Sequence, residues 1–272
     1  MAVSTTTTAT ARDADTRPDG PTPYSRTAAF GLLLIASAPL LILLVTLATG
    51  GSLEDAVLFI PAIAIPLVAA ALVFRFGLWA KIVGLIVALL AAAVMYWTVL
   101  GLTFPASFGD FVPGMAFLIG FVLAVGGAIA AIIRRRATAA ATPERRIIGA
   151  AGALVAAAAV VSGALGLLGR EPAPNEGGTP VTMADFAFAE GTYEMATGEP
   201  ARMVVHNRDG FVHDIAIPEL GVDKVAVLPG RGVVVDVPAP AAGTYTVYCT
   251  LHSNLAETDP EQAGMAALLV VE

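Results

Sequence analysis

Residues 243–252 read GTYTVYCTLH, a glycine-led run of β-branched and aromatic residues that carries the only cysteine of the chain, Cys249. The pattern of residues 243–249 is typical of a β-strand. The chain has three histidines, and all of them, His206, His213 and His252, lie in its last quarter with this cysteine. A single cysteine excludes an intramolecular disulfide and a four-cysteine zinc or iron–sulfur site. The chemistry of the protein is therefore expected in its C-terminal part.

The sequence around this run has the same short-strand character. Further β-branched and apolar runs, separated by Gly, Pro and Asp-Gly, cover residues 201–206, 214–217 and 231–237. Short strands at this spacing predict an antiparallel β-sandwich over residues 179–272.

Upstream of this domain the composition is that of a membrane protein. Of the 272 residues, 57% are hydrophobic and 14% are charged, and the mean hydropathy is +0.78. Each of five stretches without a charged residue is close to the ~20 residues that a helix needs to cross a ~30 Å hydrocarbon layer. They cover residues 27–49, 56–74, 82–102, 111–133 and 147–168. The sequence therefore predicts a five-helix transmembrane bundle over residues 27–169.

The positive charges near these stretches predict their orientation. Lys and Arg occur before the first stretch, between the second and third, and between the fourth and fifth, at positions 12, 17, 26, 75, 81, 134–136, 145 and 146. The other two connections, residues 50–55 and 103–110, contain neither. By the positive-inside rule the N-terminus is cytoplasmic, and five crossings place the C-terminal domain on the extracytoplasmic face of the plasma membrane.

Two segments flank the predicted bundle. Residues 1–26 are rich in Thr, Ala, Asp and Pro without an apolar period, which predicts a disordered cytoplasmic tail. Residues 170–178 predict a linker that spans roughly 17 Å as a flexible coil, so the C-terminal domain stays close to the membrane. The five stretches contain no Asp, Glu, Lys, Arg or His, so we expect an anchor or scaffold rather than a transporter.

Three segments of the C-terminal part belong together: residues 207–214 (NRDGFVHD), residues 243–252, and the pair Gly264-Met265 before the apolar end of the chain. Together they resemble the cupredoxin family, the plastocyanin-like blue-copper proteins. In that family a histidine follows an Asn-containing turn, a Gly-x-Tyr strand ends in cysteine, a second histidine follows shortly after, and a methionine precedes the last strand. The resemblance implies a cupredoxin-like Greek-key sandwich.

The resemblance also implies a ligand set for one type 1 copper ion. His213, Cys249 and His252 correspond to the three strong equatorial ligands, and Met265 to the weak axial ligand. Thiolate and thioether sulfur suit Cu(I), while imidazole nitrogen also suits Cu(II), so this set can hold both oxidation states. Since Cys249 and His252 are three residues apart, we expect them on one short loop.

The interval between His252 and Met265 is longer than is usual in the family. We interpret residues 253–262 as a loop insertion that leaves Met265 in place. An oxygen from this insertion is the alternative axial ligand, supplied by Glu257, Glu261 or Gln262.

Other residues near these segments have weaker assignments. Asn207 and Asp214 flank His213, and either they hydrogen-bond and fix it or they are ordinary turn residues. His206 lies in a strand-like run and is predicted not to be a ligand. Three methionines are expected in the core or on the surface rather than in a copper-loading site: Met183, Met195 and Met203.

Charge and histidine number narrow the function. The net charge of −7 disfavours a nucleic-acid partner. Residues 171–272 hold 15 acidic and 4 basic side chains; this excess either steers a basic redox partner, such as a cytochrome or an oxidase, or serves solubility alone. Enzymes with several copper sites need additional histidine ligands, and after His213 and His252 only His206 is left. We therefore expect an electron carrier rather than a substrate-converting enzyme.

The sequence thus predicts a membrane-anchored type 1 copper protein that carries single electrons on the extracytoplasmic face. Two alternatives stay open. One is a copper store, chaperone or sensor without electron transfer, and the other is an accessory subunit of a respiratory membrane complex.

Overall fold

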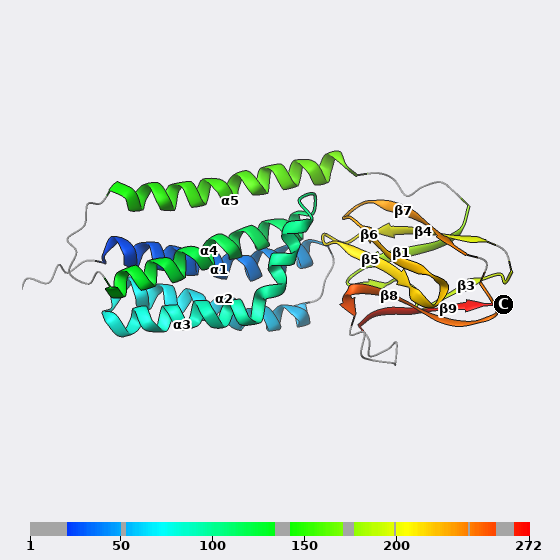
Figure 1. The fold of residues 1–272 in the computed structure, drawn as a ribbon, viewed down its shortest axis with the longest axis horizontal. Coiled ribbons are helices and arrows are strands. Elements are labelled where there is room, and N and C mark those ends of the chain that lie inside the picture. Colours follow the sequence, from blue (N-terminus) through cyan, green and yellow to red (C-terminus); the bar gives the residue numbers. More distant parts are fainter. Residues whose placement is uncertain are drawn as a thin grey trace, which may run out of the picture.

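A bundle of helices is followed by a β-sandwich in the computed structural model (Figure 1). The structure describes residues 21–49, 53–133, 142–170, 177–198, 200–238, 240–253 and 264–272. The helices of these residues are α1 (Pro23–Ala48), α2 (Leu53–Arg75), α3 (Leu78–Met95), the 3₁₀ helix η1 (Tyr96–Thr103), α4 (Phe108–Ile133) and α5 (Thr142–Leu168).

Four helical segments of the described residues are long and apolar enough to cross a membrane. They are Pro23–Ala48, Leu78–Thr103, Phe108–Ile133 and Glu144–Leu168. The apolar helix found within α2, Phe59–Arg75, is shorter. The five predicted helices are therefore present, and length and composition support a membrane span for four of them.

The first helix begins earlier than predicted. Thr22 accepts a hydrogen bond from the backbone N–H of Ser25 at 3.2 Å, and Pro23 occupies the first turn. Both features favour the start of a helix. The prediction of a disordered tail over residues 1–26 is therefore wrong for residues 23–26, and residues 1–20 lie outside the described part of the chain.

The third predicted span is not a single α-helix. Its α-helical part ends at Met95 and continues as η1. The hydroxyls of Thr98 and Thr103 donate to carbonyls three residues earlier, both at 2.7 Å, which suits the tighter 3₁₀ winding. A Cβ at Gly101 would lie 2.4 Å from the carbonyl oxygen of Asp110, so glycine at this position lets η1 approach α4.

Small residues bring α1 and α4 into close contact. A Cβ at Gly31 would lie 2.3 Å from the backbone nitrogen of Ala124, and one at Gly127 would lie 2.6 Å from that of Ala28. Close backbone approach of this kind is a common mode of helix association in membranes. The two helices form the centre of the bundle, and α5 runs along its side (Figure 1).

Two sheets form the sandwich. The first has the strand order β2-β1-β4-β7 and the second has the order β3-β9-β8-β5-β6. The strands are β1 (Thr179–Ala184), β2 (Ala187–Phe188), β3 (Thr192–Met195), β4 (Ala201–Asn207), β5 (His213–Ile217), β6 (Val222–Val227), β7 (Gly232–Val237), β8 (Gly243–Ser253) and β9 (Gly264–Val271). All four strand-like runs expected between residues 201 and 252 are present.

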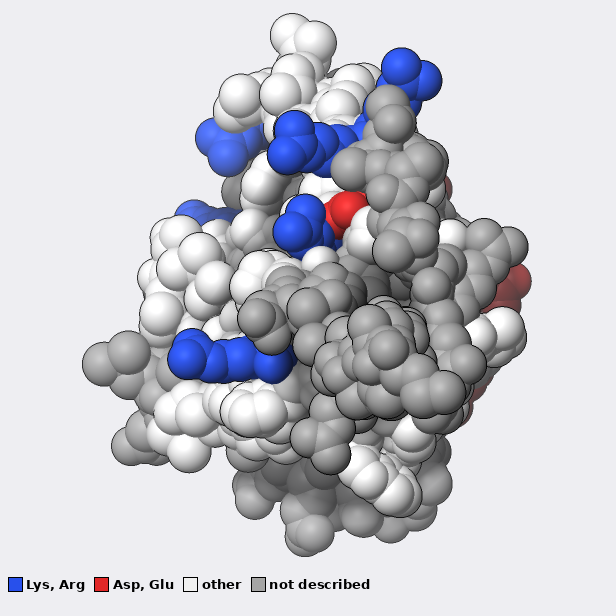
Figure 2. Space-filling view, turned by 90° about the vertical axis from the view of Figure 1, so that its left-hand side faces the viewer, with Lys and Arg blue, Asp and Glu red and all other residues white. Residues whose placement is uncertain are grey.

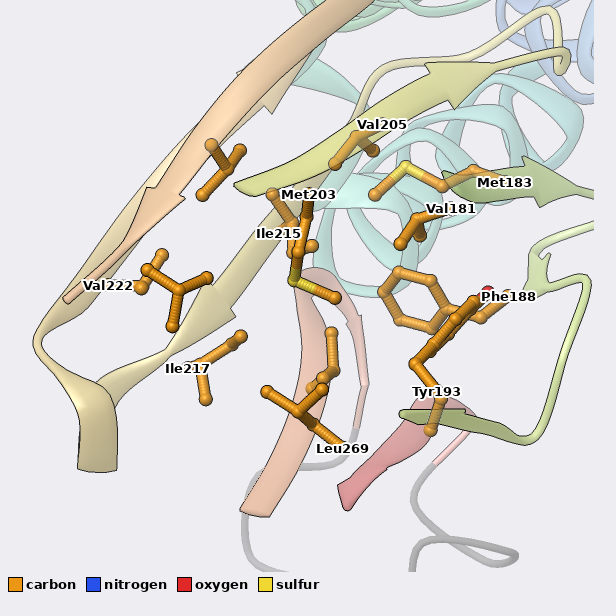
Figure 3. Close-up of a cluster of buried hydrophobic side chains, with 14 of the residues drawn as sticks. Val181, Met183, Phe188, Tyr193, Met203, Val205, Ile215, Ile217, Val222 and Leu269 are labelled. Carbon is orange, nitrogen blue, oxygen red and sulfur yellow. The ribbon is translucent and has the colours of Figure 1, made fainter. Parts of the chain in front are cut away.

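The core lies between the two sheets. Side chains from both meet there, among them Val181 and Met203 of the first sheet and Ile215 and Leu269 of the second (Figure 3). Met183, Met195 and Met203 all belong to this buried cluster, so of the two places predicted for them, core or surface, they lie in the core.

The sandwich is not antiparallel throughout. β1 pairs with β4 in parallel, and so does β3 with β9, while the other pairings are antiparallel. The antiparallel prediction is therefore wrong for these two pairs. Between β1 and β4 the chain passes through β3 in the other sheet, so no tight hairpin forces the direction to reverse.

The sandwich packs against the ends of the helices. A Cβ at Gly109 in α4 would lie 2.4 Å from the carbonyl oxygen of Gly210, and one at Gly210 would lie 2.5 Å from the Val45 side chain in α1. Asp110 accepts a hydrogen bond from the backbone N–H of Val212 at 2.8 Å. Of the predicted linker, residues 171–176 lie outside the described part. These contacts turn the β4–β5 loop, just before His213, toward the bundle.

Candidate metal centre

The structure brings three of the predicted ligand side chains together. His213 is the first residue of β5, and Cys249 and His252 belong to β8. The two histidine Nδ1 atoms are 3.0 Å apart, and the Cys249 Sγ lies 3.4 Å from that of His252 and 3.9 Å from that of His213. His213 and Cys249 are fully buried, and His252 is partly exposed. Within the described residues, these are the His, Cys and acidic side chains grouped closely enough to hold a metal ion.

This donor set fits copper. Two imidazole nitrogens and one sulfur face a common point, and a trigonal group of two histidines and a cysteine is characteristic of copper sites that transfer electrons. Each histidine presents Nδ1 to the cluster, so Nε2 remains for contacts with the surrounding protein.

Cys249 and His252 do not lie on a separate loop as predicted, since β8 continues to Ser253. In a regular strand, residues three apart point to opposite faces. The pairing of β8 with β9 is interrupted between Tyr248 and Ser253. An irregularity of this kind redirects side chains, and it places Cys249 and His252 on the same side.

A buried carboxylate orients His213. Its Nε2 lies 2.7 Å from Oδ2 of Asp209, which is 3% exposed. Asp209 also accepts hydrogen bonds from the backbone N–H groups of Asp185 at 2.7 Å and Phe186 at 3.0 Å. With the proton of His213 on Nε2, Nδ1 is left as the metal ligand.

The ionisation of Asp209 suits this role. Burial by itself would raise its pKa, but the hydrogen bonds from His213, Phe186 and Asp185 outweigh burial and hold the pKa below its usual value. The carboxylate therefore stays charged at neutral pH. Asp209 was not among the predicted site residues, although it lies in the same segment, four residues before the histidine.

Asn207 fixes the loop before His213 rather than the histidine itself. Its Nδ2 donates to the carbonyl oxygens of Phe211 and Val227, both at 2.8 Å, and its Oδ1 accepts from the backbone N–H of Asp209 at 2.9 Å. The amide thereby holds the carboxylate that in turn orients His213.

Asp214 fixes the cysteine strand. Its side chain accepts from the backbone N–H and the hydroxyl of Thr250, at 2.5 and 2.6 Å. Its own backbone N–H points to Cys249 Sγ at 3.3 Å. The side chain of Asp214 therefore forms hydrogen bonds, but with Thr250 of the cysteine strand rather than with His213.

Burial shifts the pKa of both predicted ligands on β8. It raises the pKa of the Cys249 thiol to about 11, despite the opposing backbone N–H of Asp214. It lowers the pKa of His252 to about 4, helped by the neighbouring His213. In the metal-free protein at neutral pH the thiol is therefore protonated and His252 is neutral. Since Cys249 binds a metal as the thiolate, metal binding releases the proton of the thiol.

The axial position stays a prediction. Met265 is 1% exposed and belongs to the same buried cluster as Cys249. Its carbonyl accepts a hydrogen bond from the Ser253 hydroxyl at 2.6 Å, which ties the end of β8 to the start of β9. Residues 254–263, which hold the alternative oxygen ligands Glu257, Glu261 and Gln262, lie outside the described part of the chain.

An aromatic side chain not singled out in the sequence covers the cluster. The ring of Phe186 packs edge-on against both histidine rings, at centroid distances of 5.6 Å from His213 and 5.1 Å from His252. Phe211 packs against Phe186 at 5.1 Å. His206 lies in β4 and is not part of the metal cluster of the described residues.

Comparison with known proteins identifies the domain that carries this cluster. The family model of the cupredoxin-like domain matches residues 151–258. Solved structures similar to the chain include auracyanin from the photosynthetic bacterium Roseiflexus castenholzii (17% identity, 34% of this chain and 94% of that chain, TM-score 0.26). They also include auracyanin B (20%, 38% and 96%, TM-score 0.28) and a reduced Cu(I) form of an amicyanin mutant (19%, 36% and 84%, TM-score 0.27). No curated protein matches the chain.

The chain therefore contains a cupredoxin-like domain preceded by apolar, membrane-type helices, as the sequence predicted. The family match and the cluster of two histidines and one cysteine support one copper ion in this domain.

Proposed function

We propose that the protein is a membrane-anchored type 1 copper protein that carries single electrons. The observation behind this proposal is the group formed by buried His213 and Cys249 and partly exposed His252, whose donor atoms all lie within 4.8 Å of one another. His213, Cys249 and His252 would hold the copper ion as its three strong ligands, and Met265 would be its weak ligand. The bound ion would supply the change between Cu(II) and Cu(I).

The surroundings of the ligands support electron transfer. Asp209 holds His213, and the backbone N–H of Asp214 points to Cys249. A ligand set fixed by buried hydrogen bonds changes little in geometry when the metal gains an electron, and little rearrangement favours rapid transfer. A copper chaperone instead has to release its metal, for which a fully buried cysteine is poorly placed.

The charge distribution supports an extracytoplasmic sandwich. Basic side chains gather at the end of the bundle that lies away from the sandwich (Figure 2). The described ones near these helix ends are Arg26, Arg75, Lys81, Arg145 and Arg146. Since positively charged helix ends stay in the cytoplasm, we place the sandwich on the opposite face, with all five helices crossing. The acidic excess of residues 171–272 then faces basic redox partners, such as a cytochrome or an oxidase.

A redox titration of the full chain tests the proposal. Copper-loaded protein in detergent is expected to show an intense thiolate-to-copper absorption that bleaches on reduction and returns on oxidation at one defined potential. Transfer of Cu(I) to an acceptor, with no reversible bleaching at any potential, would show a copper-handling protein instead.

A further inference from the structure

A cavity lies between the helix ends and the end of the sandwich that holds the metal cluster. Its volume is about 390 Å³, within the ~300–1,000 Å³ range of small-molecule sites. Both domains line it, the bundle with residues that include Ile42, Thr46, Trp97 and Asp110, and the sandwich with Phe186 and His252 among others. A molecule in this cavity would touch the helices and a proposed copper ligand at the same time.

We propose that this cavity binds a lipid-soluble hydroquinone, which reduces the copper centre. The inference rests on the proposed function, because it names the class of electron donor for the same copper ion.

The position of the cavity favours a donor from the membrane. Thr46 lies near the C-terminal end of α1, and Asp110 lies in the first turn of α4. These helix ends lie at the membrane surface when the helices span the bilayer, so a carrier dissolved in lipid reaches the cavity without entering water. A soluble protein has less access to this side of His252, because Gly109 and Gly210 hold the two domains in direct contact.

The lining matches an aromatic ring with a hydroxyl group. Phe186 and Trp97 offer aromatic surfaces, against which a planar ring packs favourably. Asp110 supplies an acceptor: the hydrogen bonds it receives from Ser107 and from the backbone of Val212 both end on Oδ2. Its Oδ1 is thus the oxygen that would accept a hydrogen bond from the ring hydroxyl.

The electron balance requires two reductions of copper for each donor molecule. Oxidation of one hydroquinone to the quinone releases two electrons and two protons. The copper centre takes one electron at a time, changing from Cu(II) to Cu(I), and an acceptor protein reoxidises it between the two transfers. The two protons leave the ring hydroxyls for the water outside the membrane.

Binding is tested on the copper-free full chain with oxidised decylubiquinone as the probe. Trp79→Phe leaves Trp97, which lines the cavity, as the only tryptophan. We expect saturable quenching of its fluorescence. Thr46→Phe fills the cavity and should weaken this binding at least tenfold, whereas Leu44→Phe, at an exposed position on the same helix, should leave it unchanged. Quenching that does not saturate, and is equal in all three proteins, would overturn the inference.

Reduction is tested on copper-loaded protein without oxygen, with decylubiquinol and with ascorbate. Thr46→Phe and Asp110→Asn should each lower the rate of bleaching by decylubiquinol, relative to the rate with ascorbate in the same protein, at least tenfold. Asp110→Asn keeps the test decisive if the larger side chain at position 46 prevents folding. Equal decylubiquinol rates in all proteins would overturn the inference and leave the electron carrier intact. Failure of every reductant to bleach the band would overturn the proposed function itself.

Discussion

The two histidines of the cluster stand in different surroundings. His213 is fully buried, and Asp209 holds its Nε2 within a hydrogen-bonded loop. His252 is partly exposed, contacts the cluster through Nδ1, and lines the cavity beside the helices. We call these the fixed side and the open side of the cluster. The difference suggests that one side sets the geometry of the copper ion while the other gives electrons access to it.

The largest expected effect comes from the sulfur that both sides share. Cys249→Ser replaces the thiolate with a weakly acidic hydroxyl, so the intense thiolate-to-copper absorption should disappear altogether. Visible and electron paramagnetic resonance spectra of the copper-loaded full chain provide the measurement. An undiminished band in this variant would refute the ligand assignment and remove the basis for distinguishing the two sides.

Acid should destabilise the metal-free protein first through the open side. The pKa of His252 is about 4 in the folded protein against 6.5 for the free side chain. As the pH falls below 6.5, the unfolded chain binds a proton that the folded protein does not bind. The shift corresponds to a loss of about 3 kcal/mol of unfolding free energy, complete near pH 4.

Thermal unfolding of the metal-free full chain between pH 7 and pH 4 measures this loss. His252→Gln should flatten the pH dependence in that window. Asp209 on the fixed side has a pKa below the usual 3.8 of an aspartate side chain. The stability that it contributes is therefore lost only at more acidic pH, as the pH falls from 3.8 through the lower pKa of the folded protein. A slope that is unchanged by His252→Gln would contradict the assignment of this window to the open side.

Asp209→Asn tests the fixed side. The carboxylate stabilises the more positive Cu(II) state through His213, so its loss should raise the reduction potential. A hydrogen bond to a charged group typically contributes ~1.5–3 kcal/mol. A loss of about 1 kcal/mol of this stabilisation from Cu(II) relative to Cu(I) corresponds to roughly 50 mV for one electron. Asp236→Asn is the control, since Asp236 is exposed and pairs with Arg202; it should leave the potential unchanged. A potential equally unmoved in Asp209→Asn would show that this carboxylate does not tune the copper.

The sequence predicts the residues of the cluster better than the residues that hold them in place, for a physical reason. Donor types at fixed spacing, such as Cys249 and His252, are visible in the chain because copper chemistry restricts them. The role of Asp209 depends on a loop that bends back so that Asp185 and Phe186 donate to it. This bend rests on contacts between residues more than twenty positions apart, which no local pattern records.

In the membrane part, too, local patterns predict the elements but not the contacts between distant residues. Hydropathy predicts five helices, because the apolar length of each is a local property. Composition gives no indication that Gly109 and Gly210 bring the loop before His213 against the helix ends. The hydrogen bond between Asp110 and Val212 joins residues 102 positions apart. The composition of residues 103–110 indicates only a connection without Lys or Arg, so it does not predict that the carboxylate of Asp110 lines the cavity.

The smallest expected effect concerns the axial position, which neither histidine occupies. Met265→Gln replaces a weak thioether ligand with an amide oxygen. A harder axial donor stabilises Cu(II), so the absorption band should shift without disappearing and the potential should fall. Met203→Leu, at a buried methionine in the opposite sheet, should change neither. Met265 directly follows the point where β8 and β9 pair again at Ser253 and Gly264. An unchanged spectrum and potential in Met265→Gln would contradict its role as the axial ligand and favour the alternative, an axial oxygen from residues 253–262.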